Sequence, residues 1–316
     1  MNHRCPAIEL GDVRFAYGDH RALDGVSLEV QPGEVFIFLG PNGGGKTTLF
    51  RLLSTLVPPQ QGSIRVLGHE LPRQAAALRR RMGVVFQAPS LDKKLTVEEN
   101  LNYQAALYGL RGNQLQQRKQ LLLEQLKLSD RRRQIVEQLS GGLRRRVELA
   151  KGMLHQPELL LLDEPSTGLD PGARADLWKY LLFLRDELSV TIVLTTHLLE
   201  EAERADRIAI LDCGKLVALG APDELKATVG GDTITIETAA PETVVDQIRS
   251  QLGLAAQVLE QAVRLELPEA HQWVPRIVEV AGERIKSVQV GKPTLEDVFI
   301  DKTGHRFVSL ETGTRA

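Results

Sequence analysis

The sequence has very little cysteine and no long apolar run. Only two of its 316 residues are cysteines, Cys5 and Cys213, and their spacing is not that of a metal site. A disulfide framework is therefore not expected, and a reducing compartment is the simpler interpretation. No apolar signal-peptide core follows the N-terminus, and no window approaches the roughly 18 apolar residues of a membrane span. We expect a soluble, cytoplasmic protein.

An excess of positive charge is also lacking. The formal net charge is −2, so nucleic acid is not an expected partner. Arginine runs at 79–81, 131–133 and 144–146 are interpreted as solvated helix faces. The apolar content of 42% and charged content of 25% are ordinary for a globular protein. The length is sufficient for one large domain and a smaller one.

A phosphate-binding loop lies between an apolar run and a helical pattern. Residues 35–39 are apolar, and Gly-x-x-x-x-Gly-Lys-Thr occupies residues 40–47. Such a loop turns its N–H groups toward phosphates, and the N-terminus of the following helix adds a positive dipole. Lys46 brings a charge to the outer phosphates, and the Thr47 hydroxyl is a magnesium ligand. The sequence therefore predicts a site for nucleotide phosphates.

Two further stretches carry chemistry. The apolar run 159–162 ends at Asp163 and Glu164, which places acids at the carboxyl end of a strand, where ligands of parallel sheets bind. Asp163 would help to hold magnesium, and Glu164 would orient or deprotonate a water. Ser140-Gly141-Gly142 opens a helix and forms a second possible anion site. Taken alone, the first stretch is equally compatible with a solvated acidic turn, and for the second a simple capped helix is the favoured interpretation.

The pattern along the chain predicts an α/β fold with a mostly parallel sheet, after an antiparallel N-terminal subdomain. We expect strands at 7–10, 13–17, 26–30, 35–39, 63–66, 82–86, 159–162, 191–195 and 207–211. We expect helices at 46–56, 96–128 with a break at 109–112, 139–154, 171–188 and 198–205.

The character of the sequence changes near residues 230–231. Strands are expected at 233–237, 257–259, 262–267 and 285–290, with a hairpin turn at Glu260-Gln261, and helices at 242–252 and 271–281. This βαββαβ order predicts a small α+β, ferredoxin-like domain. The expected domains are a core over 1–230 with a helical subdomain at about 88–155, an accessory domain over 231–304 that includes a short helix at 296–301, and a loose tail over 305–316.

Over about residues 7–225 these motifs resemble those of the ATP-binding cassette family, the motor subunits of ABC transporters. Gly40–Thr48 matches the Walker A motif, Leu159–Glu164 Walker B, Leu139–Gly142 the signature, Gln87 the Q-loop, Ser166–Asp170 the D-loop and His197 the switch histidine.

The resemblance implies a P-loop ATPase that binds ATP and Mg²⁺. The implied ATP-binding residues are Tyr17, which would stack on adenine, and Gly40, Pro41, Asn42, Gly43, Gly44, Gly45, Lys46, Thr47 and Thr48. Thr47, Gln87 and Asp163 would approach the metal. The implied catalytic set is Glu164 at the attacking water, His197 at the γ-phosphate, and Gln87. In the family two cassettes pack head to tail, so a homodimer would hold ATP between one chain's loop and the partner's Ser140, Gly141 and Gly142, beside the D-loop Asp170.

Two departures from the family pattern are informative. Gly44 stands where the family often has alanine or serine, and we expect this to be harmless or slightly loosening. Leu143 replaces a glutamine that is usual in importers. A hydrophobic residue at this position resembles the pattern of drug-resistance and ABC-2 type exporters. Segments 90–92, 95–100 and 292–299 fit the same branch.

The expected function is ATP hydrolysis that drives export of a drug-like, lipid or polysaccharide substrate through a separate ABC-2 type permease. The protein would lie at the cytoplasmic face of the inner or plasma membrane. One alternative is an importer ATPase with a C-terminal ligand-sensing domain, since methionine-importer ATPases also carry a ferredoxin-like extension. The other is a soluble ABC ATPase of translation or DNA repair.

Overall fold

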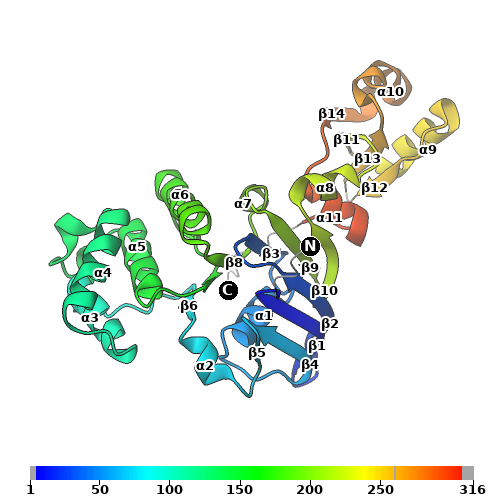
Figure 1. The fold of residues 1–316 in the computed structure, drawn as a ribbon. Coiled ribbons are helices and arrows are strands. Elements are labelled where there is room, and N and C mark those ends of the chain that lie inside the picture. Colours follow the sequence, from blue (N-terminus) through cyan, green and yellow to red (C-terminus); the bar gives the residue numbers. More distant parts are fainter. Residues whose placement is uncertain (1–4, 260, 308–316) are drawn as a thin grey trace. The chain divides into compact units, whose positions relative to one another are not determined.

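The computed structural model describes residues 5–259 and 261–307, and it divides into two compact units (Figure 1). The first unit ends at Leu216 and the second begins at Val217. The sequence predicts a boundary near residue 230 instead. The division falls earlier because helix α8 (Pro222–Ala227) packs against helix α11 (Leu295–Thr303) of the second unit. No helix among the described residues has the length and apolar character needed to cross a membrane.

The chain begins with an antiparallel sheet. Its strand order is β2 (His20–Val30), β1 (Ile8–Tyr17), β4 (Gln61–Val66) and β5 (His69–Glu70). The two strands expected before residue 18 form one strand, because the register shifts between Leu10 and Val13 and Asp12 takes a positive φ of 49°. The irregularity is thus a β-bulge, which bends a strand without ending it.

A six-stranded sheet forms the centre of the first unit. Its order is β10 (Lys215–Gly220), β9 (Arg207–Asp212), β3 (Val35–Leu39), β8 (Thr191–Thr196), β7 (Leu159–Asp163) and β6 (Met82–Val85). The division between the units at Leu216 falls within its edge strand β10. The pairs from β9 to β6 are parallel. Strands β3, β7 and β8 are buried at every residue, as expected for parallel strands covered on both faces. The predicted mostly parallel α/β core is confirmed.

Helices α3, α4 and α5 form a separate helical lobe beside this sheet (Figure 1). They are α3 (Val97–Leu107), α4 (Gly112–Gln125) and α5 (Gly141–Met153), with short 3₁₀ turns at Ser129–Arg131 and Val136–Gln138. The predicted break lies between α3 and α4, where Gly109 and Gly112 both take a positive φ. The other helices of this unit are α1 (Lys46–Leu53), α2 (Ala75–Arg79), α6 (Pro171–Leu188) and α7 (Leu199–Ala202). Helices α1 and α7 are shorter than the sequence predicts.

The second unit contains the predicted βαββαβ order. Its sheet runs β12 (Gln257–Leu259), β13 (Ala262–Leu267), β11 (Asp232–Thr238) and β14 (Ile285–Gly291), with all neighbours antiparallel. Helices α9 (Pro241–Leu252) and α10 (Val274–Ala281), which follows a 3₁₀ turn at Ala270–Gln272, pack on a core that includes Ile236 and Ile248. This is the ferredoxin-like strand order.

Two expectations for the second unit concern the hairpin turn at residues 260–261 and the C-terminal tail. The turn residue Glu260 lies outside the described residues, as do 308–316 of the predicted tail. Within the described part of that tail, Phe307 is buried and its ring lies 5.0 Å from the ring of Phe299. The tail is therefore packed against α11 at Phe307, because burial of an aromatic ring lowers the free energy relative to its exposure to solvent.

Candidate active site

The phosphate loop follows β3 and runs into α1, as the sequence predicts. Its glycines allow close approach to β9 and β2. A Cβ at Gly40 would lie 2.2 Å from the Leu211 carbonyl oxygen, and Gly45 has φ 103° with the Ala22 carbonyl 2.8 Å from its Cβ position. At Gly44 a Cβ would lie 2.9 Å from the same Leu211 oxygen. An alanine at 44 would therefore press the loop against β9, so this departure from the family pattern is not neutral for packing.

Lys46 is only 4% exposed and turns its ammonium group back to the loop. Its Nζ donates to the carbonyl oxygens of Gly40, at 2.7 Å, and Pro41, at 2.8 Å. Burial lowers the pKa of Lys46, while the nearby Glu164 and Asp163 oppose that shift. Phosphate oxygens at this position would therefore be strongly attracted to the Lys46 ammonium group, because little water screens its charge.

A cavity of about 180 Å³ lies over the loop. Its lining residues come from the loop and from the turn between β1 and β2: Tyr17, His20, Ala22, Asn42, Gly43, Gly45, Lys46, Thr47 and Thr48. Tyr17 is 43% exposed, and its hydroxyl accepts a bond from Arg51 at 3.4 Å. A ring with this exposure is compatible with the predicted stacking on a base. His20 was not expected here. Its place two residues after Gly18, in a tight turn beside Tyr17, is the signal that could have indicated it.

The acidic pair follows β7 at the carboxyl edge of the sheet. Asp163 is buried and accepts a bond of 2.6 Å from the Thr195 hydroxyl, which lies opposite it on β8. Burial raises the pKa of Asp163, and the Thr195 bond partly offsets the shift. Thr195 also accepts from the backbone N–H of Glu164 at 3.0 Å, so one hydroxyl holds both acids. The sequence did not indicate Thr195, although it stands two residues before His197.

Glu164 brings together the three predicted catalytic residues. Its carboxylate accepts a bond from Gln87 Nε2 at 3.3 Å and one from the Thr167 hydroxyl at 3.2 Å. His197 Nδ1 lies 3.3 Å from Glu164 Oε1, without the geometry of a hydrogen bond. These groups leave β6, β7 and β8 at neighbouring positions of one sheet edge. The arrangement can place a polarised water beside the phosphate loop.

The signature residues and the D-loop acid lie at the starts of two other helices. Ser140 caps α5, its Oγ accepting from the Leu143 N–H at 3.3 Å, and Asp170 caps α6, accepting from the Ala173 N–H at 2.9 Å. Ser140 and Gly141 are exposed, and neither lines the cavity over the phosphate loop. Within one chain the structure thus does not bring the signature to the predicted nucleotide site.

The third arginine run is not the solvated face that the sequence indicates. Arg145 donates to the Phe86 carbonyl at 2.9 Å, and Arg146 forms an ion pair of 2.6 Å with Asp176 on α6. Both are half-buried, because they tie α5 to neighbouring elements. Residues 131–133 are exposed, as expected.

Oxygen donors suited to a hard cation stand beside the loop. The Thr47 hydroxyl, the Gln87 amide and the Asp163 carboxylate are the groups that the sequence predicts as ligands. Thr47 is exposed to the cavity, and Asp163 lies close enough to Lys46 for their charges to interact. A buried carboxylate with a raised pKa gains from a nearby cation, so this donor set fits Mg²⁺.

Comparisons with known proteins agree with this geometry. A family profile described as ABC transporter matches residues 23–167, and another, described as the C-terminal domain of DrrA1-3-like ATP-binding proteins, matches 220–303. The daunorubicin resistance ATP-binding protein DrrA3 of Streptomyces coeruleorubidus is 41% identical, with 94% of this chain and 96% of the relative covered. The Nod factor export ATP-binding protein I of Cupriavidus metallidurans is 38% identical over 94% and 97%.

Solved structures extend the similarity to three dimensions. The cbiO1 component of a Clostridium perfringens transporter complex superposes with a TM-score of 0.66 at 25% identity, over 78% of this chain and 96% of the other. A dimeric ATP-binding cassette in a post-hydrolysis state with ADP and Pi superposes with a TM-score of 0.62 at 26% identity, over 68% and 98%. In that structure a cassette of this fold is paired with a second one.

Proposed function

The chain belongs to the ABC transporter family of ATP-binding subunits, of the drug-resistance exporter type, and from that premise we propose how it works. It is an ATPase, and we infer that two copies bind two ATP molecules between them and power export through a separate ABC-2 type permease. One observation carries the proposal. The chain holds a complete phosphate site and a complete signature helix, yet the signature does not line the cavity over its own phosphate loop.

A second copy supplies what one chain lacks. In a head-to-tail dimer the exposed Ser140 and Gly141 of one copy would face ATP held on Lys46 and Thr47 of the other. The N-terminus of α5 offers free N–H groups and a positive dipole end to the γ-phosphate. ATP therefore binds the closed dimer better than the open monomer and shifts the equilibrium between them.

The residues at the sheet edge then carry hydrolysis. Tyr17 orients adenine, Lys46 and the loop amides hold the phosphates, and Glu164 positions a water and accepts its proton. His197 contacts the γ-phosphate, and Gln87 senses whether the site is filled. Thr47, Gln87 and Asp163 would hold Mg²⁺, which would supply positive charge to the phosphates. When the γ-phosphate is lost, the contacts through which ATP joins the two copies are lost as well.

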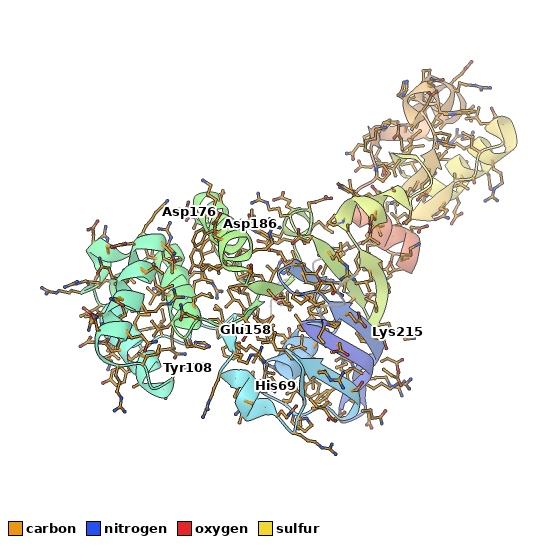
Figure 2. The ribbon with its side chains drawn as sticks, in the orientation of Figure 1. His69, Tyr108, Glu158, Asp176, Asp186 and Lys215 are labelled. Atoms are coloured by element: carbon orange, nitrogen blue, oxygen red, sulfur yellow. The ribbon has the colours of Figure 1, made fainter. Side chains whose placement is uncertain are left out.

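A groove next to Gln87 suits the permease. Its lining includes Thr55 and Arg79, which follow α1 and end α2, and Tyr108 and Glu148 of the helical lobe. Figure 2 shows Tyr108 on that lobe. Buried Glu148 accepts two bonds from Ser90, at 2.6 Å to its N–H and 2.9 Å to its hydroxyl. Ser90 stands three residues after Gln87, so a permease segment in this groove would act on a loop that carries a catalytic residue.

The transported substrate is proposed from the relatives. Their names mention daunorubicin and Nod factor, and a further relative, the linearmycin resistance ATP-binding protein LnrL of Bacillus subtilis, is 33% identical over 94% of this chain and 98% of its own. We infer a bulky amphipathic cargo such as a drug-like or lipid-like molecule. The match of residues 220–303 to a drug-resistance C-terminal domain favours export over a ligand-sensing importer.

Pull-down of a membrane protein from detergent-solubilised membranes tests the groove. Tyr108→Glu should lower recovery of the permease by about tenfold or more, since burying an unpaired charge at an interface costs over 1.4 kcal/mol. Tyr103→Glu is the matched control, because Tyr103 lies on α3, the helix that Tyr108 caps, is 65% exposed and does not line the groove. Equal recovery by both variants contradicts the docking site. Recovery of ribosomes or DNA in place of a permease contradicts the transport function.

A further inference from the structure

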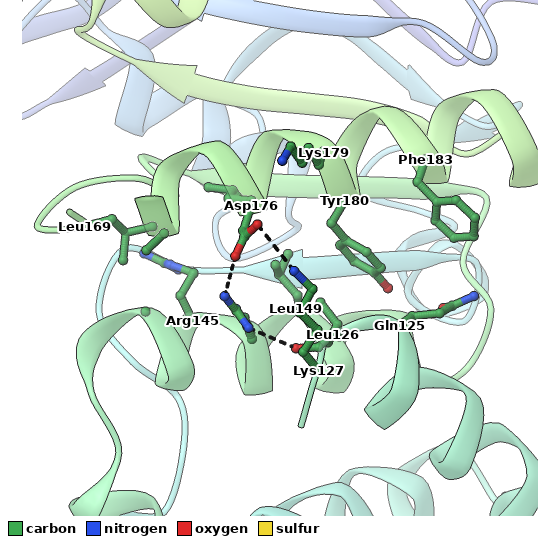
Figure 3. A pocket seen from close by; sticks show the side chains of 14 residues that line it. Gln125, Leu126, Lys127, Arg145, Leu149, Leu169, Asp176, Lys179, Tyr180 and Phe183 are labelled. Carbon is green, nitrogen blue, oxygen red and sulfur yellow. Dashed lines mark hydrogen bonds and ion pairs between the residues drawn. The ribbon is translucent and has the colours of Figure 1, made fainter. Parts of the chain in front are cut away.

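A second cavity, distinct from the one over the phosphate loop, lies between α5 and α6 (Figure 3). Its volume is about 310 Å³, which is at the lower end of the range for small-molecule sites. Leu149 of α5 and Leu177 of α6 form its apolar walls, and Phe183 closes one end. Leu126 completes the apolar lining from the chain that follows α4. The cavity is therefore shaped for a compact apolar body.

Two polar atoms in this lining have no partner. The Tyr180 hydroxyl belongs to a residue that is only 7% exposed, and both this oxygen and Gln125 Oε1 lack any hydrogen bond. Figure 3 shows Tyr180 and Gln125 at the same end of the cavity, with the hydroxyl turned toward the amide. Burial raises the pKa of Tyr180, so its hydroxyl remains a neutral donor, while Gln125 Oε1 is an acceptor. Buried polar groups are nearly always bonded, and each unpaired one costs free energy.

Charged groups also line this cavity. Asp176 of α6 pairs with Arg146 at 2.6 Å and with Lys127 at 3.6 Å, and Arg146 also donates to the Leu126 carbonyl at 3.5 Å (Figure 3). Cations outnumber the acid in this lining, so a positively charged molecule is disfavoured there. The same ion pairs join the helical lobe to α6.

We propose that this cavity is a binding site for a small, uncharged, largely apolar molecule that carries a hydrogen-bond acceptor and donor side by side, as a carboxamide does. Its carbonyl accepts from Tyr180, and its N–H donates to Gln125. Gly142 of the signature and Ala173 beside the D-loop both line the cavity. A bound molecule thus sets the position of α5 against α6 and so modulates ATP-dependent pairing. This modulation rests on the proposed function, whereas the binding itself does not.

Titration calorimetry of the full-length protein with 2-naphthamide tests the site. We expect one molecule bound per chain with a Kd of about 1 mM or lower, the affinity typical for a ligand of this size. Tyr180→Phe should weaken binding about five- to tenfold, because one buried hydrogen bond is lost. Ala173→Phe should abolish binding by filling the cavity. The control Tyr103→Phe should bind like the wild type, and methyl 2-naphthoate, which has no N–H, should bind more weakly.

Two results would overturn the site. They are no binding to the wild type up to the solubility of 2-naphthamide, or the same affinity in Tyr180→Phe and the wild type. Tyr180→Phe keeps the shape of the side chain, so it decides the question even if Ala173→Phe fails to fold.

The modulation has a separate readout. In Glu164→Gln, saturating 2-naphthamide should shift the ATP concentration at half-maximal dimer formation by at least about twofold. No shift, with binding intact, would overturn the modulation alone. A failure of Glu164→Gln to form dimers without 2-naphthamide would count against the proposed function and leave the binding result standing.

Discussion

Glu164 occupies a backbone conformation that residues other than glycine rarely adopt. Its φ is 41°, and such strain costs on the order of 1–3 kcal/mol. The residue is held there because its carboxylate accepts bonds from Gln87 and Thr167, and its backbone N–H donates to the Thr195 hydroxyl. Strain of this kind is kept where it positions a functional group, in this case a carboxylate at the edge of the sheet beside the phosphate loop.

Replacing this carboxylate by an amide should separate binding from chemistry. Glu164→Gln keeps the size of the side chain but cannot accept a proton from water. We expect ATP to bind as in the wild type and the ATPase rate to fall about a hundred- to ten-thousand-fold, as is typical when a general base is lost. Steady-state release of phosphate measures this effect. An unchanged rate would remove the role assigned to Glu164.

Asp163 should reveal a conflict between stability and function. Its pKa is raised by burial, so the folded state favours the protonated acid, and ionisation costs stability as the pH rises above the ordinary value of 3.8. Asp163→Asn still accepts the Thr195 bond and carries no charge. It should abolish ATPase activity while leaving Tm at pH 7 equal to the wild type or up to about 3 °C higher.

Melting curves from pH 4 to pH 8 provide the check on Asp163. The advantage of Asp163→Asn over the wild type should grow toward neutral pH, since only the wild-type residue ionises. A Tm for the variant several degrees below the wild type at pH 7 would contradict this account.

The sequence predicts candidate site residues where the chemistry lies in a local motif. Lys46 and Glu164 follow apolar strands, and their residue types at those positions have few other uses. Thr195 and His20 escaped prediction because their roles come from neighbours that are distant in the chain. Thr195 meets Asp163 only through the pairing of β7 with β8, which no local pattern specifies.

At the scale of elements, the structure explains the residue types found in segment 292–299. Thr294 caps α11 and Asp297 completes a capping box with it. Asp297 also pairs with Arg264 Nη1 at 2.7 Å, and Arg264 Nη2 pairs with Glu266 at 2.9 Å. The arginine is only 4% exposed, so it joins β13 to α11 through a buried ion-pair network.

Removing this arginine should unfold part of the second unit. Arg264→Ala leaves Glu266 and Asp297 without their partner, and breaking a buried pair costs about 3–5 kcal/mol. Hydrogen exchange should show faster exchange across β13 and α11, with the first unit unchanged. Arg284→Ala is the control, because Arg284 is exposed in the same unit. Equal protection in both variants would contradict the proposed importance of the network.

Errors in the predicted elements also have physical causes. The gap expected before Val13 is a bulge, since Asp12 absorbs the extra residue and pairing with β2 resumes at Val13. Strand β10 and helix α8 were not predicted, although Pro222 at a helix start and Glu224 three residues after Ala221 were available signals. The change of composition near residues 230–231 obscured these weaker signals.

On the scale of the whole molecule, the proposed function treats the phosphate loop and the signature as the two halves of a site that one chain does not close alone. The phosphate loop lies over β3, and the exposed start of α5 lies in the helical lobe. A C₂ dimer of identical chains would complete two such sites at once. On this account, complete binding of the ATP phosphates requires that two copies are paired.

The most direct test is the mass of the full-length protein in solution, measured by sedimentation. Glu164→Gln should be a monomer without nucleotide or with ADP and a dimer with ATP and Mg²⁺. Adding Ser140→Arg should keep it monomeric in ATP, because a bulky side chain at the start of α5 blocks the partner's nucleotide. The same mass under all these conditions, or a dimer that ignores Ser140→Arg, would contradict the claim that ATP joins two copies through the signature.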